Sequence, residues 1–181
     1  MANDPQLIKK TAIEIIDLLR AGQVTPLDLL DTLEARIGAV DGQVNALPTL
    51  CFGRAREHAE QLMKHDSKDR GLLAGLPIPI KDLTPVSGVR FTSGSLLFEN
   101  NVAENSDLLV ELIEERGGVV YAKSNTPEFG AGGNTFNDVF GATLNPWDLT
   151  KSTAGSSGGA AAALASGTAW LAHGSDMGGS L

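Results

Sequence analysis

Residues 154–164 read AGSSGGAAAAL, and residues 175–180 read SDMGGS. Both stretches place serines among glycines, and the alanine run after the first cluster favours a helix. Glycines before Ser180 would let backbone N–H groups converge on a substrate oxygen, as an oxyanion hole requires. A tight turn with an incidental serine is the commoner explanation of either stretch alone. Whether these serines form a functional site therefore has to be decided from their combination with other motifs.

The composition is that of an ordinary globular protein. The chain has 181 residues, of which 42% are hydrophobic and 20% charged, so it can form one domain with a sizeable core. A net charge of -8 argues against a nucleic-acid surface, which needs clustered cations. The single cysteine, Cys51, excludes an internal disulfide and a multi-cysteine zinc site.

The sequence carries no recognisable export or membrane signal. Its N-terminus lacks a basic region followed by an apolar run, so we expect no signal peptide. No stretch approaches the ~18 consecutive apolar residues of a membrane span. A cytoplasmic protein is the expectation that follows.

Residues 1–70 are predicted to form an N-terminal helical section. Apolar periodicity and capping residues predict helices that begin at Thr11 and Thr25, and a third over about residues 54–64. The polar run at 65–70 reads as a solvated loop and marks the boundary of this section.

Residues 71–181 are predicted to form an α/β core. Residues 76–80 contain two prolines and suit an edge strand. A helix capped by Ser106 and Asp107 leads into a buried strand at 119–122, and a further strand is predicted at 169–172. The irregular segment before the first serine cluster, about residues 130–155, is long enough to suggest a functional loop.

Two other interpretations of the first serine cluster fail on sequence. A phosphate-binding P-loop needs a lysine after its glycines, and none follows here. Ser157 is the centre of a Gly-x-Ser-x-Gly pattern, but α/β-hydrolases need an acid and then a histidine after the serine. The only later histidine is His173, and Asp176 follows it. We interpret His173 as a packing or exposed residue.

Four motifs in order resemble the amidase signature family, serine hydrolases that cleave amide bonds without a catalytic histidine. They are GLPIPIKD at 75–82, AKSNTPEF at 122–129, AGSSGG at 154–159 and SDMGGS at 175–180. Each alone is a weak signal, but the ordered set is specific and spans most of the chain beyond about residue 70. The resemblance implies an amidase signature fold, with a mixed central sheet covered by helices.

The resemblance also implies a Ser–Ser–Lys triad. Ser180 would be the nucleophile, and Ser156, after a cis peptide bond from Gly155, would connect it to Lys81. Lys81 would act as a base, which requires a neutral amine although an unperturbed lysine has a pKa of about 10.4. Burial beside the isoleucines of its own strand is the physical means of lowering that pKa.

Backbone groups complete the implied site. Ser157 and Asp176 would support the loop, and no metal or organic cofactor is implied. The oxyanion hole would consist of the N–H groups of Met177, Gly178, Gly179 and Ser180.

The function implied is hydrolysis of a small-molecule carboxylic amide to an acid and an amine or ammonia, through an acyl-enzyme. Two alternatives stay open. One is the glutamine-amidase subunit of a tRNA-dependent amidotransferase, which would need partner subunits. The other is a non-catalytic fragment whose glycine loop binds an anion. The resemblance also allows a homodimer.

Amidase signature proteins are considerably longer than this chain, and their sheet continues past the nucleophile. We therefore expect either a fragment of a longer enzyme or an incomplete chain, with little or no turnover by itself. Ala154 and Ala160 replace small residues that are common at those positions in the family, and neither replacement touches a proposed catalytic oxygen.

Overall fold

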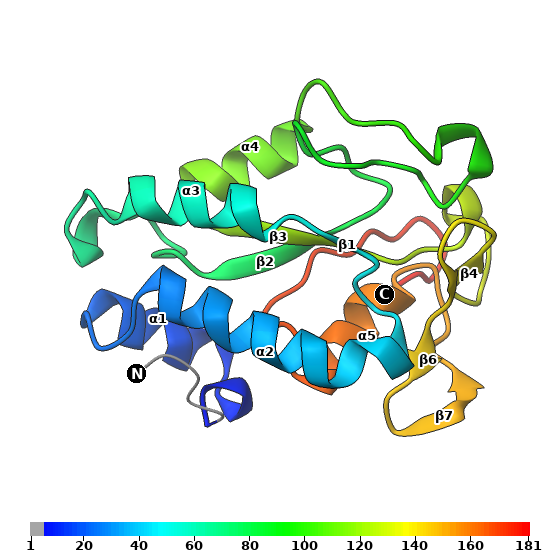
Figure 1. The fold of residues 1–181 in the computed structure, drawn as a ribbon, viewed down its shortest axis with the longest axis horizontal. Helices are drawn as coiled ribbons and strands as arrows, with labels where there is room; N and C mark the ends of the chain where they lie inside the picture. The colour runs from blue at the N-terminus through cyan, green and yellow to red at the C-terminus, as the bar shows by residue number, and fades with distance from the viewer. Residues whose placement is uncertain (1–5) are drawn as a thin grey trace.

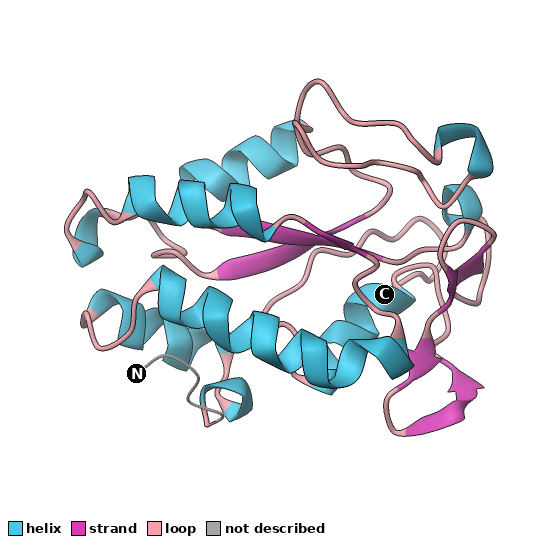
Figure 2. Ribbon diagram, viewed as in Figure 1, coloured by secondary structure: helices cyan, strands magenta, loops and turns pink. Residues whose placement is uncertain are grey.

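The computed structural model describes residues 6–181 as three layers, helices over both faces of a small sheet (Figures 1 and 2). One face carries α1 (Ala12–Arg20), α2 (Pro26–Val44) and α5 (Gly158–Ser166). The other face is covered by α3 (Phe52–Leu62) and α4 (Leu108–Glu115). The α/β fold class is confirmed.

The sheet has the strand order β1-β3-β2. Strand β3 (Val119–Ser124) is central, antiparallel to β1 (Thr49–Leu50) and parallel to β2 (Pro77–Lys81). Every residue of β2 and β3 is buried, because helices cover both faces of this parallel pair. The register pairs Lys81 at the end of β2 with Ser124 at the end of β3.

Two small hairpins lie within the segment that the sequence shows as irregular. Strands β4 (Phe136–Asn137) and β5 (Gly141–Ala142) form the first, and β6 (Leu144–Asn145) and β7 (Asp148–Ser152) form the second. Their strands are too short to show alternation in the sequence. They occupy one end of the molecule, beyond the sheet, and lead back to α5 (Figure 1).

The predicted helix starts at Thr11 and Thr25 are confirmed by their caps. Each threonine side chain accepts a hydrogen bond from the third residue of its helix, and the acidic side chain there bonds back to the threonine N–H. The start of α4 differs from the prediction. Asp107 is its cap, whereas the Ser106 hydroxyl accepts from the Ser87 N–H instead.

The strand predicted at 169–172 is not formed. Trp170 is 8% exposed, and its indole Nε1 donates to the Leu7 carbonyl oxygen at 2.9 Å, which turns this segment toward the N-terminal helices. Only one backbone hydrogen bond then reaches β2, from the His173 N–H to the Pro79 oxygen at 3.1 Å. The apolar run at 169–172 therefore packs in the core and does not form a strand of the sheet.

A single hydrophobic cluster connects the N-terminal helices with the strands. It includes Leu33 of α2, Ala59 of α3, Val120 of β3 and Ala162 of α5. The boundary at residue 70 remains a prediction, and residues on both sides of it share this cluster.

Candidate active site

The end of strand β2 buries a lysine amine in a polar pocket. Lys81 is 0% exposed, and its Nζ donates to the Ser156 Oγ at 2.7 Å and to the Ser157 Oγ at 2.9 Å. The same amine lies 3.0 Å from the Ser175 Oγ and 3.4 Å from the Ser175 carbonyl oxygen. The structure therefore brings Lys81 together with both serines of the first cluster; the resemblance implies the contact with Ser156, whereas the contact with Ser157 is not expected from it.

Burial disfavours the charged form of this amine. It lowers the pKa of Lys81 from 10.5 to about 8, while the carboxylate of Asp176 acts in the opposite direction. A sizeable fraction of neutral amine is then present near physiological pH. A neutral amine has a lone pair and can take a proton from a neighbouring hydroxyl.

Close approach of backbones fixes the first serine cluster. A Cβ on Gly158 would collide with the side chain of Thr135, and a Cβ on Gly159 would collide with the backbone of Asn125. Glycine is therefore the residue that lets α5 begin directly beneath the end of β3. The peptide bond from Gly155 to Ser156 is cis, as the resemblance implies.

Ser180 lies on the loop that closes the described chain. Its carbonyl oxygen accepts from the Ser157 N–H at 3.2 Å, which ties this loop to the first cluster. Within residues 6–181, no hydrogen bond joins the Ser180 hydroxyl to Ser156. Both residues line the same cavity, which has a volume of about 540 Å³. The structure thus puts the two serines on one cavity without a direct bond.

Asp176 organises the turn before Ser180. Its carboxylate accepts from the Gly179 N–H at 2.5 Å and from the Leu181 N–H at 3.1 Å. These backbone donors hold the pKa of Asp176 below its ordinary value, with Gly179 the largest influence. The residues predicted for the oxyanion hole border the shared cavity, and in this conformation the Gly179 N–H points to Asp176.

Ser157 braces the segment that precedes this turn. Its Oγ donates to the Ser175 carbonyl oxygen at 3.1 Å and accepts from the Ser175 N–H at 3.2 Å. These two bonds connect the first serine cluster to Ser175, and the supporting role of Ser157 stays a prediction. The motifs do not predict Ser175 and His173 as site residues. Ser175 begins the second motif, whereas the contact of His173 with β2 has no local sequence signal.

A buried ion pair lies beside the site and joins Lys123 to Asp82, the residue that follows Lys81. Lys123 of β3 is 0% exposed and its Nζ donates to the Asp82 carboxylate at 3.0 Å and to the Thr84 carbonyl oxygen at 2.8 Å. Asp82 also accepts from the Thr92 hydroxyl at 2.6 Å. Both charges are thus compensated, and the loop after β2 is fixed to β3.

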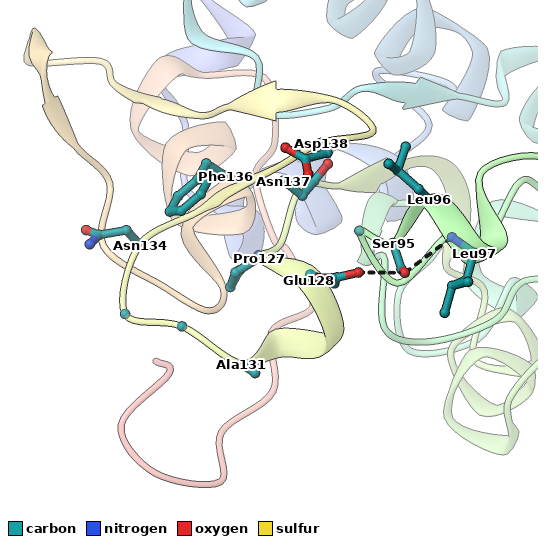
Figure 3. A pocket seen from close by; sticks show the side chains of 13 residues that line it. Ser95, Leu96, Leu97, Pro127, Glu128, Ala131, Asn134, Phe136, Asn137 and Asp138 are labelled. Carbon is teal, nitrogen blue, oxygen red and sulfur yellow. Dashed lines mark hydrogen bonds between the residues drawn. The ribbon is translucent and has the colours of Figure 1, made fainter.

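A second cavity adjoins the first. It has a volume of about 490 Å³, and the two cavities share Gly132 and Gly133. Figure 3 shows Glu128 on its wall, where the carboxylate accepts from the Ser95 hydroxyl at 2.7 Å. Phe136 and Leu97 contribute apolar walls. Space for a substrate therefore extends beyond the serines along the glycine loop.

Within residues 6–181, no group of three or more histidine, cysteine, aspartate or glutamate side chains is arranged to hold a metal ion. In the same part of the chain, no helix is both long and apolar enough to cross a membrane.

The family model described as Amidase matches residues 28–181. The chain belongs to the amidase family. This confirms the resemblance drawn from the four motifs, and solved amidase structures confirm the fold. A structure described as an amidase is 34% identical, with a TM-score of 0.83 over 94% of this chain and 39% of that chain. Fatty acid amide hydrolase is 24% identical and shares the fold, with a TM-score of 0.90. The match covers 99% of this chain and 32% of that chain.

Curated relatives of this chain are components of amidotransferases. The glutamyl-tRNA(Gln) amidotransferase subunit of Halothermothrix orenii is 40% identical over 97% of this chain and 36% of the relative. The solved structure of the corresponding glutamyl-tRNA(Gln) amidotransferase subunit from Thermotoga maritima is 30% identical, with a TM-score of 0.79 over 99% of this chain and 37% of that one. The chain therefore spans about a third of the length of the relatives it matches.

Proposed function

We propose that this chain supplies the catalytic part of an enzyme that hydrolyses a carboxylic amide. The observation that carries the proposal is the buried amine of Lys81, which lies 2.7 Å from the Ser156 Oγ. Ser156 and Ser180 line one cavity. A surface lysine would stay charged at neutral pH, whereas this one has a pKa of about 8.

The proposed reaction begins with the nucleophile. Ser180 Oγ attacks the amide carbonyl carbon, its proton passes to Ser156 Oγ, and the proton of Ser156 passes to the neutral Lys81 amine. For this relay the Ser180 hydroxyl must turn toward Ser156 when substrate binds. Active-site hydrogen bonds are often long or absent without substrate.

The tetrahedral intermediate carries a negative oxygen, which backbone N–H groups of residues 177–180 would stabilise once the Gly179 N–H turns from Asp176 toward the substrate. Its collapse breaks the C–N bond, and Ser156 returns a proton to the departing nitrogen while Lys81 reprotonates Ser156. The acyl group stays on Ser180. Water then attacks the ester, Lys81 and Ser156 again take and return the proton, and the acid leaves.

Labelling with a fluorophosphonate tests the proposal, because such a probe reacts with an activated serine. Intact-mass analysis is expected to show one adduct on the protein. The adduct should be absent in Ser180→Ala and should form at least about 100-fold more slowly in Lys81→Ala. The matched controls are Ser67→Ala and Lys151→Ala, which should label at the unaltered rate because neither residue lines the shared cavity. An adduct that persists in Ser180→Ala would overturn the assignment.

A second candidate is the glutamine-amidase activity of an amidotransferase. It is favoured by the relatives at up to 40% identity, which are named as glutamyl-tRNA(Gln) amidotransferase subunits. Ammonia release from glutamine, but not from simple aliphatic or aryl amides, and co-purification with other subunits would support it. Release from simple amides in the absence of partners would favour the general amidase.

The anion-binding alternative has weaker support. Its condition is an exposed Lys81 far from Ser180, whereas Lys81 is fully buried and bonds to Ser156, which lines the same cavity as Ser180. The Gly159 N–H at the start of α5 also donates to the Asn125 carbonyl oxygen at 3.2 Å, so this donor is occupied.

A further inference from the structure

His173 contacts the backbone of the candidate base. Its Nδ1 accepts a hydrogen bond from the main-chain N–H of Lys81 at 3.3 Å. Its own N–H donates to the Pro79 oxygen at 3.1 Å. In a parallel sheet, the N–H and the carbonyl oxygen of one residue bond to two residues of the neighbouring strand that lie two positions apart. Pro79 and Lys81 are two such residues. Here the imidazole nitrogen takes the place of that main-chain carbonyl.

The same short segment also holds the amine of Lys81. Ser175, two residues after His173, accepts from the Lys81 Nζ through its Oγ at 3.0 Å. Residues 173–175 therefore contact Lys81 twice. The His173 ring bonds to its main-chain N–H, and the Ser175 hydroxyl bonds to its amine. Loss of the ring contact would leave the His173 N–H bond to Pro79 in place and would loosen the hold of the segment on β2.

We propose that His173 is a positioning residue for Lys81: its neutral ring helps to hold residues 173–175 on β2, and protonation of the ring loosens that hold. Only a neutral imidazole has a lone pair on Nδ1, and the contact requires the tautomer with its proton on Nε2. Protonation also places an imidazolium near the Lys81 ammonium, and the two cations repel each other. This inference rests on the proposed function and adds a pH-dependent element to the same site.

The charges that face His173 favour its neutral form at neutral pH. Burial lowers the pKa of His173, and the cations Lys81 on β2 and Lys123 on β3 lower it further. Asp107, at the start of α4, acts in the opposite direction, and Asp82 is already paired with Lys123. The ring is therefore neutral above its depressed pKa, and the contact is lost as the pH falls through that value.

The contact can be tested by NMR without any catalysis. In uniformly ¹⁵N-labelled protein at pH 7.5, the His173 ring nitrogens are expected to report the Nε2–H tautomer. The Lys81 amide signal should then shift on acidification with the same midpoint as the ring. His173→Leu identifies the ring signals. An Nδ1–H tautomer, or a Lys81 amide signal that does not follow the ring, would overturn the proposal.

The role in the reaction is tested by the pH dependence of fluorophosphonate labelling. Above the pKa of the His173 ring, the log of the labelling rate should rise with pH with a slope of one, because only Lys81 must lose a proton. Below that pKa the slope should be two, because the ring must lose a proton as well. His173→Asn places an amide oxygen near the former Nδ1 but does not titrate, so it should restore a slope of one. His173→Leu should label about tenfold more slowly at pH 8, since one hydrogen bond is lost. The control is His65→Asn.

The two proposals fail differently. No adduct at any pH, with the ring and the Lys81 amide coupled in the NMR titration, would overturn the proposed function and leave the positioning contact intact. Labelling with the same steep acid limb in His173→Asn as in the unaltered protein would overturn the role of His173 and leave the proposed function intact.

Discussion

At the scale of single residues, Lys81 combines complete burial with a ring of hydroxyl groups. Burial makes its ammonium form costly, and the oxygens of Ser156, Ser157 and Ser175 offset part of that cost. Because neither the charged nor the neutral form of the Lys81 amine is strongly favoured, the amine can both take and return a proton. The same balance has a measurable effect on stability.

The folded protein should become more stable as the pH rises from 8 to 10 because of Lys81. Its pKa is about 8 when folded and 10.5 when unfolded, so the unfolded state binds more protons between these values. The gain is about 2 kcal/mol. Urea unfolding of the unaltered protein and of Lys81→Met measures the difference. An equal rise in both proteins would show that Lys81 has an ordinary pKa.

The two serines that contact Lys81 should differ in their importance for labelling. Ser156→Ala removes the proposed proton relay and should slow fluorophosphonate labelling by at least about 100-fold. Ser157→Ala removes one hydrogen bond that positions the amine, and should slow it by about fivefold. Equal losses in both variants would contradict the separate roles.

Lys81 and the two serine clusters could be singled out because they belong to an ordered set of motifs that resembles a known family, although each motif alone is weak. Glycine-flanked serines and a lysine after an apolar strand are visible as motifs, and the structure brings Lys81 and Ser156 to 2.7 Å. His173 could not be predicted, because its partner is a main-chain N–H 92 residues away. Nothing in the neighbouring sequence distinguishes such a ring from one that packs or faces solvent.

At the scale of elements, the start of α5 depends on glycine. Gly159→Ala would place a Cβ against the Asn125 backbone, and we expect a loss of about 1 to 3 kcal/mol in the free energy of unfolding. The matched control is Gly42→Ala in α2, where the space around the new Cβ is open. There we expect a gain of about 0.5 to 1 kcal/mol from helix propensity. Similar losses at both positions would contradict the proposed close approach.

Element types were predictable where the sequence repeats or changes character sharply. Strands β2 and β3 are short apolar runs that follow glycines, and α1 and α2 have capping boxes at their starts. The apolar run at 169–172 misled the prediction, because a buried strand and a core-packing loop have the same composition. Only the contact of Trp170 with Leu7, far apart in sequence, separates the two outcomes.

At the scale of the whole molecule, the site is stabilised by a core that includes both ends of the described chain. Trp170→Ala should lower the free energy of unfolding by about 3 to 5 kcal/mol, because it removes a buried ring and its bond to Leu7. Trp147 is 85% exposed, and Trp147→Ala should change stability by no more than about 0.5 kcal/mol. Denaturant unfolding compares them, and equal effects would contradict a shared core.

The central claim is that Lys81 has a lowered pKa, so that part of its amine is neutral near physiological pH and can act as a base. A ¹⁵N NMR titration of its side-chain amine tests this most directly. The Lys81→Met variant identifies the signal by its absence. We predict a midpoint near pH 8, well below the ordinary 10.5. A midpoint near 10.5 would mean that almost no neutral amine is present near physiological pH, and it would contradict the proposed mechanism.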